Sequence, residues 1–415
     1  MKLSKRVAIV YPGSNLDTVP SLTSMATLLA EYGYWVDIFT RYDKAFPKPT
    51  FENDRIAILP SQVPDRSERP ARWRFLPTPM YWLLSWPLLI LTRHWQAPYV
   101  CVIGVDPVGL VSAARAIIPL VRVPLVYYSL ELMLSYELTT EAERELKAQE
   151  RILSQRAAFV IIQDEERASL LVKDNDLSWD KIITVPNAHL GKANIQRSTY
   201  LREKFNIPPD TKIILHAGSI ANWAGTVELI QSTQDWPDDW VLVCHTRFRA
   251  DSRASCQGDI LASDYISALR CLAKPNRVLF STDPLTRHQY PMLVQSADVG
   301  VVFYCPQPGS IYQQDNLRYI GLSSGKLADY LQAGLPVLAN SPLQRLISTY
   351  NCGEVTDDPA VTRVAIERIL ANYEAYSQNA VTCFNREFDF AGKFKHVLTA
   401  LGHLALSHGK GYKHS

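Results

Sequence analysis

The sequence lacks any closely spaced pair of cysteines. Its seven cysteines are scattered at Cys101, Cys244, Cys256, Cys271, Cys305, Cys352 and Cys383. Zinc sites and disulfide frameworks usually show short, repeated cysteine spacings, and this chain has none. We therefore expect reduced thiols, a cytoplasmic protein, and neither a zinc site nor a disulfide framework.

Several further patterns are missing. The nine histidines form no H-x-x-x-H or H-E-x-x-H cluster, so no metal and no other cofactor is expected. The loop Gly13-Ser14-Asn15 after the first predicted strand is not followed by a G-x-G-x-x-G fingerprint, which argues against NAD. Lysine and arginine (43) nearly balance aspartate and glutamate (41), so no nucleic-acid partner is expected.

Long apolar runs are also scarce. The run at 80–91 contains Trp82 and Trp86, is broken by Pro87, and is shorter than a bilayer requires. It is flanked by Arg72, Arg74 and Arg93. Two interpretations stay open: a helix buried against a sheet, or an amphipathic surface resting on a membrane. The apolar run near the N-terminus is too short for a signal peptide and is predicted to be a strand.

Strand and helix patterns alternate along the chain. A chain of 415 residues favours two domains of about 200 residues each. We predict an α/β fold with a parallel sheet in each domain. The expected limits are 1–190, 200–378 and a C-terminal segment at 379–415. The predicted strands are 7–11, 35–39, 56–59, 99–103, 125–128, 159–162 and 181–185, then 213–217, 240–244, 278–280, 299–303, 336–339 and 353–355.

Open parallel sheets bind ligands beyond the carboxyl ends of their strands. Two such sheets facing each other would place these loops along a cleft between the domains. On the N-terminal side the loops contain Gly13, Ser14, Asn15 and Asp106. The small residues at 13–15 allow close approach of a ligand, although a simple turn is an equal alternative. Asp106 either contacts a hydroxyl group or caps the helix that follows it.

The segment from Gly321 to Ala339 holds the most informative pattern. Ser323, Ser324 and Gly325 stand where a helix would begin, which offers free N–H groups and a positive dipole end beside Lys326. Asp329 follows one turn later. These residues suit a ligand with a diphosphate and hydroxyl groups. The alternative is an ordinary helix that ends at Gly334.

This segment resembles the donor-binding segment of retaining glycosyltransferases with the GT-B fold. The closest similarity is to family four, which includes sucrose and bacterial polysaccharide glycosyltransferases. The matching parts are the Ser/Lys loop, the carboxylate Asp329 and the A-G-x-P-V run at 333–337. Residues 216–225 are similar to the family loop beside the diphosphate, and 127–131 with 150–168 show a weaker similarity.

The resemblance implies two Rossmann-like domains, a nucleotide-sugar donor, and a last helix that returns to the N-terminal domain. In this family the diphosphate would contact the loop at Gly218 and Ser219, with Lys326 and Arg247 supplying positive charge. Asp329 would hold the ribose. Glu131 would meet the reaction centre, although it is alternatively a helix-terminal carboxylate. Gly13, Ser14, Asn15 and Asp106 would lie on the acceptor side.

Three residues depart from the family pattern. Ser219 and Ala224 replace an arginine and a lysine, and Gly321 replaces the first of two carboxylates. A binding protein without transfer activity therefore stays open beside a hexosyltransferase. A nucleotide-sugar epimerase of the same fold is the other alternative, and it would need further catalytic carboxylates and a basic or histidine residue in the cleft. The expected partners are a nucleotide sugar and a glycan or lipid-linked acceptor. A further expected partner is the inner face of a membrane, contacted through residues 80–91. The sugar, the base and the acceptor are not specified by the sequence.

Overall fold

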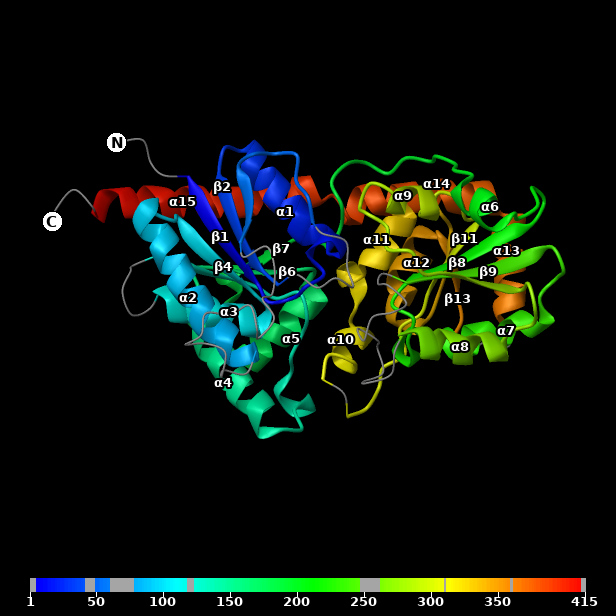
Figure 1. Ribbon diagram of the computed structural model, residues 1–415, viewed down its shortest axis with the longest axis horizontal. Coiled ribbons are helices and arrows are strands. Elements are labelled where there is room, and N and C mark those ends of the chain that lie inside the picture. Colours follow the sequence, from blue (N-terminus) through cyan, green and yellow to red (C-terminus); the bar gives the residue numbers. More distant parts are fainter. Residues whose placement is uncertain are drawn as a thin grey trace.

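The computed structural model describes residues 5–41, 49–59, 78–117, 123–246, 262–309, 311–358 and 361–411. They form two lobes, each built on a parallel sheet covered by helices (Figure 1). The strand order is β3-β2-β1-β4-β5-β6-β7 in the first sheet and β10-β9-β8-β11-β12-β13 in the second. The predicted α/β fold with two Rossmann-like sheets is confirmed.

We call the first sheet and its helices the N lobe. Its strands are β1 (Arg6–Tyr11), β2 (Trp35–Thr40), β3 (Ile56–Leu59), β4 (Cys101–Val105), β5 (Leu125–Tyr128), β6 (Val160–Ile162) and β7 (Ile182–Thr184). Its helices are the short 3-10 turn η1 (Leu16–Thr18), α1 (Pro20–Glu31), α2 (Thr78–Gln96), α3 (Asp106–Ile117), α4 (Glu141–Arg156) and α5 (Glu165–Asn175).

We call the second sheet and its helices the C lobe. Its strands are β8 (Lys212–Gly218), β9 (Trp240–Thr246), β10 (Val278–Ser281), β11 (Val299–Val302), β12 (Val337–Ala339) and β13 (Gly353–Val355). Its helices are α6 (Tyr200–Phe205), α7 (Thr226–Ser232), α8 (Ala262–Leu272), α9 (Tyr290–Val294), α10 (Asp315–Arg318), α11 (Gly325–Gln332), α12 (Gln344–Tyr350), α13 (Thr362–Ala371) and α14 (Tyr373–Glu387). Every predicted strand forms, to within two residues at each end.

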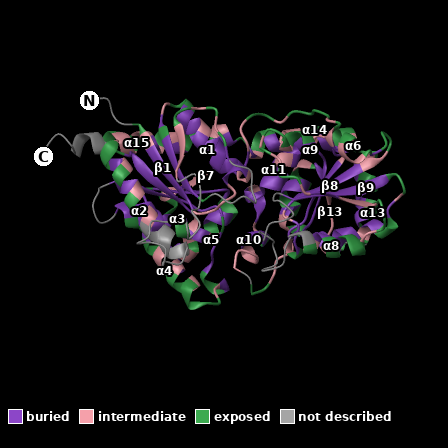
Figure 2. Cartoon of the chain, in the orientation of Figure 1, coloured by how far each residue is buried: buried purple, intermediate pink, exposed green. Residues whose placement is uncertain are grey.

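The strands are apolar because both faces of each sheet are covered. In the N lobe, Ile9 of β1 pairs with Ile38 on one side and with Ile103 on the other. Figure 2 shows the strands as buried centres of both lobes, with exposed residues on the outer helices. One face of each sheet contributes to a single apolar core through both lobes, and each opposite face has its own core. Near-continuous apolar strands are typical of such doubly covered sheets.

The last helix, α15 (Phe390–Gly411), follows the C lobe in the sequence but packs on the N lobe. It contacts α1 and β7, and Figure 1 shows it beside α1. Phe390, Phe394, Val397 and Leu401 are all buried. Their spacing gives one apolar helix face, and this face seals the N-lobe core. The proposed domain limits themselves stay predictions.

Helix α2 contains the apolar run at 80–91. Trp86 is 1% exposed and lies in the N-lobe core beside Ile90. The expectation that Trp86 rests on a membrane is therefore wrong, because its ring packs inside the protein. Leu88 and Trp95 of the same helix are exposed. The side chain of Trp82, together with Arg72 and Arg74, lies outside the described residues. No helix in the described part of the chain is long and apolar enough to cross a membrane.

Candidate active site

The N-terminus of α11 lies where the two lobes touch. Ser324 is the N-cap of α11, and its Oγ accepts a hydrogen bond from the Leu327 N–H at 3.1 Å. The carbonyl of Ser323 accepts a hydrogen bond from the N-lobe side chain of Asn187 at 3.0 Å. A Cβ on Gly325 would lie 3.2 Å from the same Asn187 amide. The structure thus brings Ser323, Ser324 and Gly325 to the junction of the lobes, where the side chain of Ser324 caps the helix.

Lys326 lies inside the C lobe, in the first turn of α11. Its side chain is buried, with a relative exposure of 3% for the residue. Burial lowers the pKa of His216 on β8, and the positive charge of Lys326 lowers it further. The same charge acts on Cys244 of β9 and on Cys305 beyond β11. Lys326 therefore places a positive charge beside the central strands of the C-lobe sheet.

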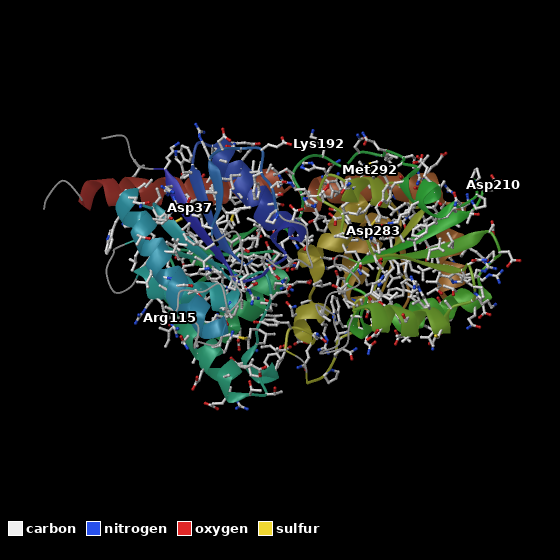
Figure 3. All side chains as sticks on the ribbon, in the orientation of Figure 1. Asp37, Arg115, Lys192, Asp210, Asp283 and Met292 are labelled. Atoms are coloured by element: carbon white, nitrogen blue, oxygen red, sulfur yellow. The ribbon has the colours of Figure 1, made fainter. Side chains whose placement is uncertain are left out.

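Asp329 stands one helical turn after Lys326 and faces the N lobe. Its Oδ1 lies 3.6 Å from Nε2 of His189, in the segment that joins the two sheets. Asp329 lines a cavity of about 400 Å³ between the lobes. On the N-lobe side this cavity is lined by Thr23, Ser24 and Thr27 of α1. Lys192 also lines it and lies above the junction of the lobes in Figure 3.

A second, smaller cavity of about 40 Å³ adjoins the first. Asp329, Arg287, Tyr290 and His189 line both cavities. His245, at the end of β9, lines only the second one; its Nδ1 lies 3.0 Å from Ser281 Oγ. The His245 ring also contacts the Tyr290 ring, with 5.9 Å between their centroids.

Strand β8 ends at Gly218, whose φ of +106° favours glycine. Ser219 follows it and is partly buried. Further along this loop, the ring of Trp223 stacks on Tyr304 at 6.3 Å between centroids. The Tyr304 hydroxyl lies 2.7 Å from the Ser324 hydroxyl, so the loop after β8 is tied to the start of α11. Arg247 lies outside the described residues.

On the N-lobe side, Asp106 and Glu131 are neighbours. Asp106 Oδ1 accepts hydrogen bonds from the N–H groups of Leu130 and Glu131, at 2.8 and 2.9 Å. Burial raises the pKa of Asp106 to about 7, and the charge of Glu131 adds to the rise. The carboxylate of Asp106 thus holds the loop after β5. Glu131 itself is exposed, and it accepts a hydrogen bond from Asn316 of α10 at 2.5 Å.

The turn at Gly13, Ser14 and Asn15 packs against its own strand. The Tyr11 hydroxyl donates to Asn15 Oδ1 at 2.6 Å, and Thr40 Oγ1 donates to the Gly13 carbonyl at 2.8 Å. A Cβ on Gly13 would collide with the Tyr11 ring. Glycine is required here because Tyr11 approaches the backbone.

Comparison with known proteins adds to this geometry. No protein-family model matches the sequence, and no curated protein is similar to it in sequence. Solved structures do match it. Sucrose-phosphate synthase from Thermosynechococcus elongatus is 15% identical, with 99% of this chain and 98% of that chain covered, at a TM-score of 0.69.

Two further structures show the same likeness. HepE from Anabaena, in complex with UDP-glucose, is 14% identical, with 98% of this chain and 99% of that one covered, at a TM-score of 0.65. WaaG, a glycosyltransferase involved in lipopolysaccharide biosynthesis, is 17% identical, with 94% and 98% covered, at a TM-score of 0.63. The chain has the GT-B fold.

One important residue of this GT-B chain was given no role from the sequence. Arg167 on α5 is fully buried, and its guanidinium bonds to groups from both lobes. It donates to Leu130 O and Gln163 Oε1 in the N lobe, and to Asn316 O, Asn316 Oδ1 and Tyr319 O in the C lobe. Burial lowers the pKa of Arg167, and nearby carboxylates led by Glu131 oppose this. An arginine in a surface helix pattern gives no signal of such a role.

The missing carboxylate at position 321 also has a structural explanation. Gly321 has a φ of +38°, and a Cβ there would lie 2.5 Å from Oδ2 of Asp164 in the N lobe. That same oxygen accepts a hydrogen bond from the Leu322 N–H at 3.0 Å. A glutamate at 321 would collide with Asp164, so this contact between the lobes requires glycine. No group of three or more metal-binding side chains occurs among the described residues.

Proposed function

We propose that the protein is a retaining hexosyltransferase that moves a sugar from a nucleotide-sugar donor to a glycan or lipid-linked acceptor. The observation that carries this proposal is the arrangement on α11. A buried ammonium group at Lys326 and a carboxylate at Asp329 stand one turn apart on this helix, and Asp329 lines the crevice of a GT-B fold. One end suits a diphosphate and the other suits hydroxyl groups.

The reaction would make a bond from the acceptor oxygen to the anomeric carbon and break the bond from that carbon to an oxygen of the diphosphate. The diphosphate would leave with the bonding electron pair, and the proton of the acceptor hydroxyl would pass to the departing diphosphate. Lys326 and the loop at Gly218 and Ser219 would stabilise the negative charge that grows on the departing diphosphate. Asp329 would hold the ribose. Glu131 would meet the acceptor or the positive charge that develops on the sugar ring. Its contact with Asn316 supports this role, because it brings Glu131 to the junction of the lobes.

Solved complexes of a structural neighbour support a nucleotide-sugar donor. HepE has been crystallised with UDP-glucose, with UDP, and with UDP and glucose. The protein would work without a metal ion, because Lys326 would offset the charge of the diphosphate. Arg247 and the acceptor-side residues Gly13, Ser14, Asn15 and Asp106 stay part of this proposal.

Incubation with a panel of UDP-, GDP- and ADP-sugars and a cell lipid extract tests the proposal. We expect release of a nucleoside diphosphate together with a glycosylated product, unchanged by EDTA. Isomerised nucleotide sugar would instead indicate an epimerase. Binding without release would indicate a protein that has lost transfer, which the departures at Ser219, Ala224 and Gly321 favour as the second candidate. No binding of any nucleotide sugar would refute all three.

We further propose that the acceptor is reached at a membrane surface on the cytoplasmic side, through α2. Leu88 is 55% exposed and Trp95 is 69% exposed on this helix, and Arg93 lies between them in the sequence. Exposed apolar residues beside a cation suit an anionic lipid surface. Sedimentation with anionic vesicles should fall in a Leu88→Ser, Trp95→Ser variant. The exposed Trp179 of the N lobe provides the control, since Trp179→Ser should sediment as the wild type does.

A further inference from the structure

The smaller cavity between the lobes is closed on its N-lobe side by the turn η1 and the start of α1. Asp17, Thr18 and Pro20 line it there, opposite His245, Tyr290 and Asp329 of the C lobe. Asp17 and Asp329 therefore border one cavity from two different lobes.

Asp17 is a buried carboxylate with spare hydrogen-bonding capacity. The residue is 7% exposed. Its Oδ2 accepts a long hydrogen bond of 3.3 Å from the backbone N–H of Arg287. Its Oδ1 is buried and has no hydrogen-bond partner. Burial raises the pKa of Asp17, and the positive charge of Arg287 opposes this rise. A buried polar atom without a partner is costly, so it calls for an explanation, such as a bound water, an ion or a functional role.

The lining of the cavity indicates what that ligand offers. Carboxylates accept hydrogen bonds and repel phosphate groups, so Asp17 and Asp329 together disfavour a diphosphate in this cavity. The rings of His245 and Tyr290 line the opposite wall, tilted by 46° to each other. The positive charge for a diphosphate lies one turn away, at Lys326. The smaller cavity, at about 40 Å³, admits single hydroxyl or N–H groups, and the adjoining cavity of about 400 Å³ has room for the rest of a nucleoside.

We propose that Asp17 is a donor-binding residue contributed by the N lobe, whose Oδ1 accepts a hydrogen bond from the nucleoside part of the donor. The hydrogen comes from a ribose hydroxyl or from an N–H of the base. The inference rests on the proposed function and deepens it, because a nucleoside held by Asp17 and Asp329 joins the two lobes.

The contacts of Arg287 with the N lobe support this geometry. Arg287 belongs to the C lobe, but its guanidinium donates to the N-lobe carbonyl of Thr50 at 2.5 Å. It also lies over the ring of Phe51, at 4.7 Å from the centroid. These contacts hold the backbone N–H of Arg287 at Asp17 and so fix the direction of the carboxylate. Oδ2 is thereby occupied, and Oδ1 is left to accept a hydrogen bond from a ligand.

Binding calorimetry with UDP, GDP, ADP and inorganic pyrophosphate tests the role of Asp17. We compare the wild type with Asp17→Asn, whose amide oxygen would keep the hydrogen bond from the Arg287 N–H and whose NH2 group, which cannot accept a hydrogen bond, would replace Oδ1. We expect binding of the preferred nucleoside diphosphate to weaken about tenfold to a hundredfold, as for loss of one hydrogen bond to a charged group. Pyrophosphate should bind within about twofold of the wild type, because its site lies at Lys326.

A matched control is Asp37→Asn. Asp37 is also a buried N-lobe aspartate, but it pairs with Arg6 and Tyr99 inside the lobe, away from the junction (Figure 3). Nucleotide binding by folded Asp37→Asn should match the wild type. Asp17→Asn should itself fold at least as stably as the wild type without ligand, because it removes a buried charge.

Analogues locate the donated hydrogen. If the hydrogen comes from the ribose, the wild type should bind 2′-deoxy or 3′-deoxy nucleotides weakly. Asp17→Asn should bind the same analogues with about the affinity of the wild type, because the hydrogen bond is already lost. If the hydrogen comes from the base, a nucleotide methylated on the base N–H should likewise bind weakly, and equally so, to the wild type and to Asp17→Asn. Either result supports the proposal. Equal loss of nucleotide and pyrophosphate binding, or no loss at all, would overturn the role of Asp17 alone. Absence of nucleotide binding by the wild type would instead refute the proposed function, and the role of Asp17 with it.

Discussion

Lys326 and Asp329 show how strongly one helical turn changes the surroundings of a charged residue. Lys326 is buried beside the strands of the C lobe, whereas the Asp329 side chain keeps 10% of its exposure and faces the crevice. The residues are three positions apart, so both lie near one face of α11. Helix geometry thus separates the proposed diphosphate end of the site from its nucleoside end.

Replacing Lys326 with alanine should lower turnover by a factor of about one hundred or more, because one preorganised electrostatic stabiliser is lost. The measurement is the rate of nucleoside diphosphate release with saturating donor. Lys393, an exposed lysine on α15, provides the control, since Lys393→Ala should keep the wild-type rate. Near-normal turnover in Lys326→Ala would remove Lys326 from the mechanism.

Asp106 should make stability depend on pH. Burial and the charge of Glu131 raise its pKa from 3.8 to about 7. The folded protein therefore holds the proton more tightly than the unfolded chain does. The contribution of this group is fully present below pH 3.8 and is lost as the pH rises to about 7.

The variant Asp106→Asn keeps the oxygen that accepts from Leu130 and Glu131, and asparagine tolerates the positive φ. We expect its melting temperature, relative to the wild type, to be higher at about pH 8 than at about pH 5. Thermal unfolding followed by circular dichroism at both pH values measures this. An equal difference at the two pH values would show that Asp106 has an ordinary pKa.

Among the elements of the C lobe, a single glycine controls the contact between β11 and α11. A Cβ on Gly300 of β11 would collide with the Tyr330 ring of α11. Tyr330 is fully buried, and its hydroxyl bonds to the backbone of Ala217 and Leu215 on β8. The ring therefore has no free space to move into.

Gly300→Ala should lower the free energy of unfolding by about 1–3 kcal/mol through overpacking. It should also weaken nucleotide binding, because α11 carries Lys326 and Asp329. Gly402 on α15 is the matched control, since a Cβ there meets no atom within 4 Å. Gly402→Ala should raise stability by up to about 1 kcal/mol through helix propensity. In denaturant unfolding, the midpoint should fall for Gly300→Ala and rise for Gly402→Ala.

The elements could be predicted from the sequence because their apolar patterns are local. The run Val337–Ala339 and the helix before it were predicted, since Ser324, Gly334 and the spacing between them are signals within a few residues. The surroundings of Trp86 were harder to predict. A short apolar run with tryptophans is the same pattern for a buried helix and for a membrane surface, and only the packing against the sheet distinguishes the two.

At the scale of the whole molecule, the lobes are joined through buried hydrogen bonds around Arg167. Arg167→Leu should lower the free energy of unfolding by about 3 kcal/mol or more, because the carbonyls of Leu130, Asn316 and Tyr319 lose their donor. Denaturant unfolding measures the loss.

The exposed Arg144, which pairs with Glu141 on α4, is the control for Arg167. Arg144→Leu should change stability by no more than about 0.5 kcal/mol. If the lobes are held mainly by Arg167, cleavage by a protease in the segment 185–199 should become faster in Arg167→Leu alone. Unchanged stability and cleavage would show that other contacts hold the lobes together.

Contacts between the lobes are the part of the site that the sequence could not predict. Asp17 and Arg287 are 270 residues apart, and no local pattern relates them. Arg167 and Asn316 likewise meet only after both lobes have folded. The residues on α11 were found because a helix start and its charges can be read locally. Asp17 was not found, because its significance depends on what packs against it.

The return of α15 to the N lobe has a consequence for synthesis of the chain on the ribosome. The first lobe emerges before the helix that covers α1 and β7 exists, and this helix begins only at Phe390. An apolar face of the nascent N lobe therefore stays uncovered while the C lobe is translated. Completion of the N lobe is thus timed by a segment that is made after the C lobe, and a nascent-chain protease assay should show late protection of residues near α1.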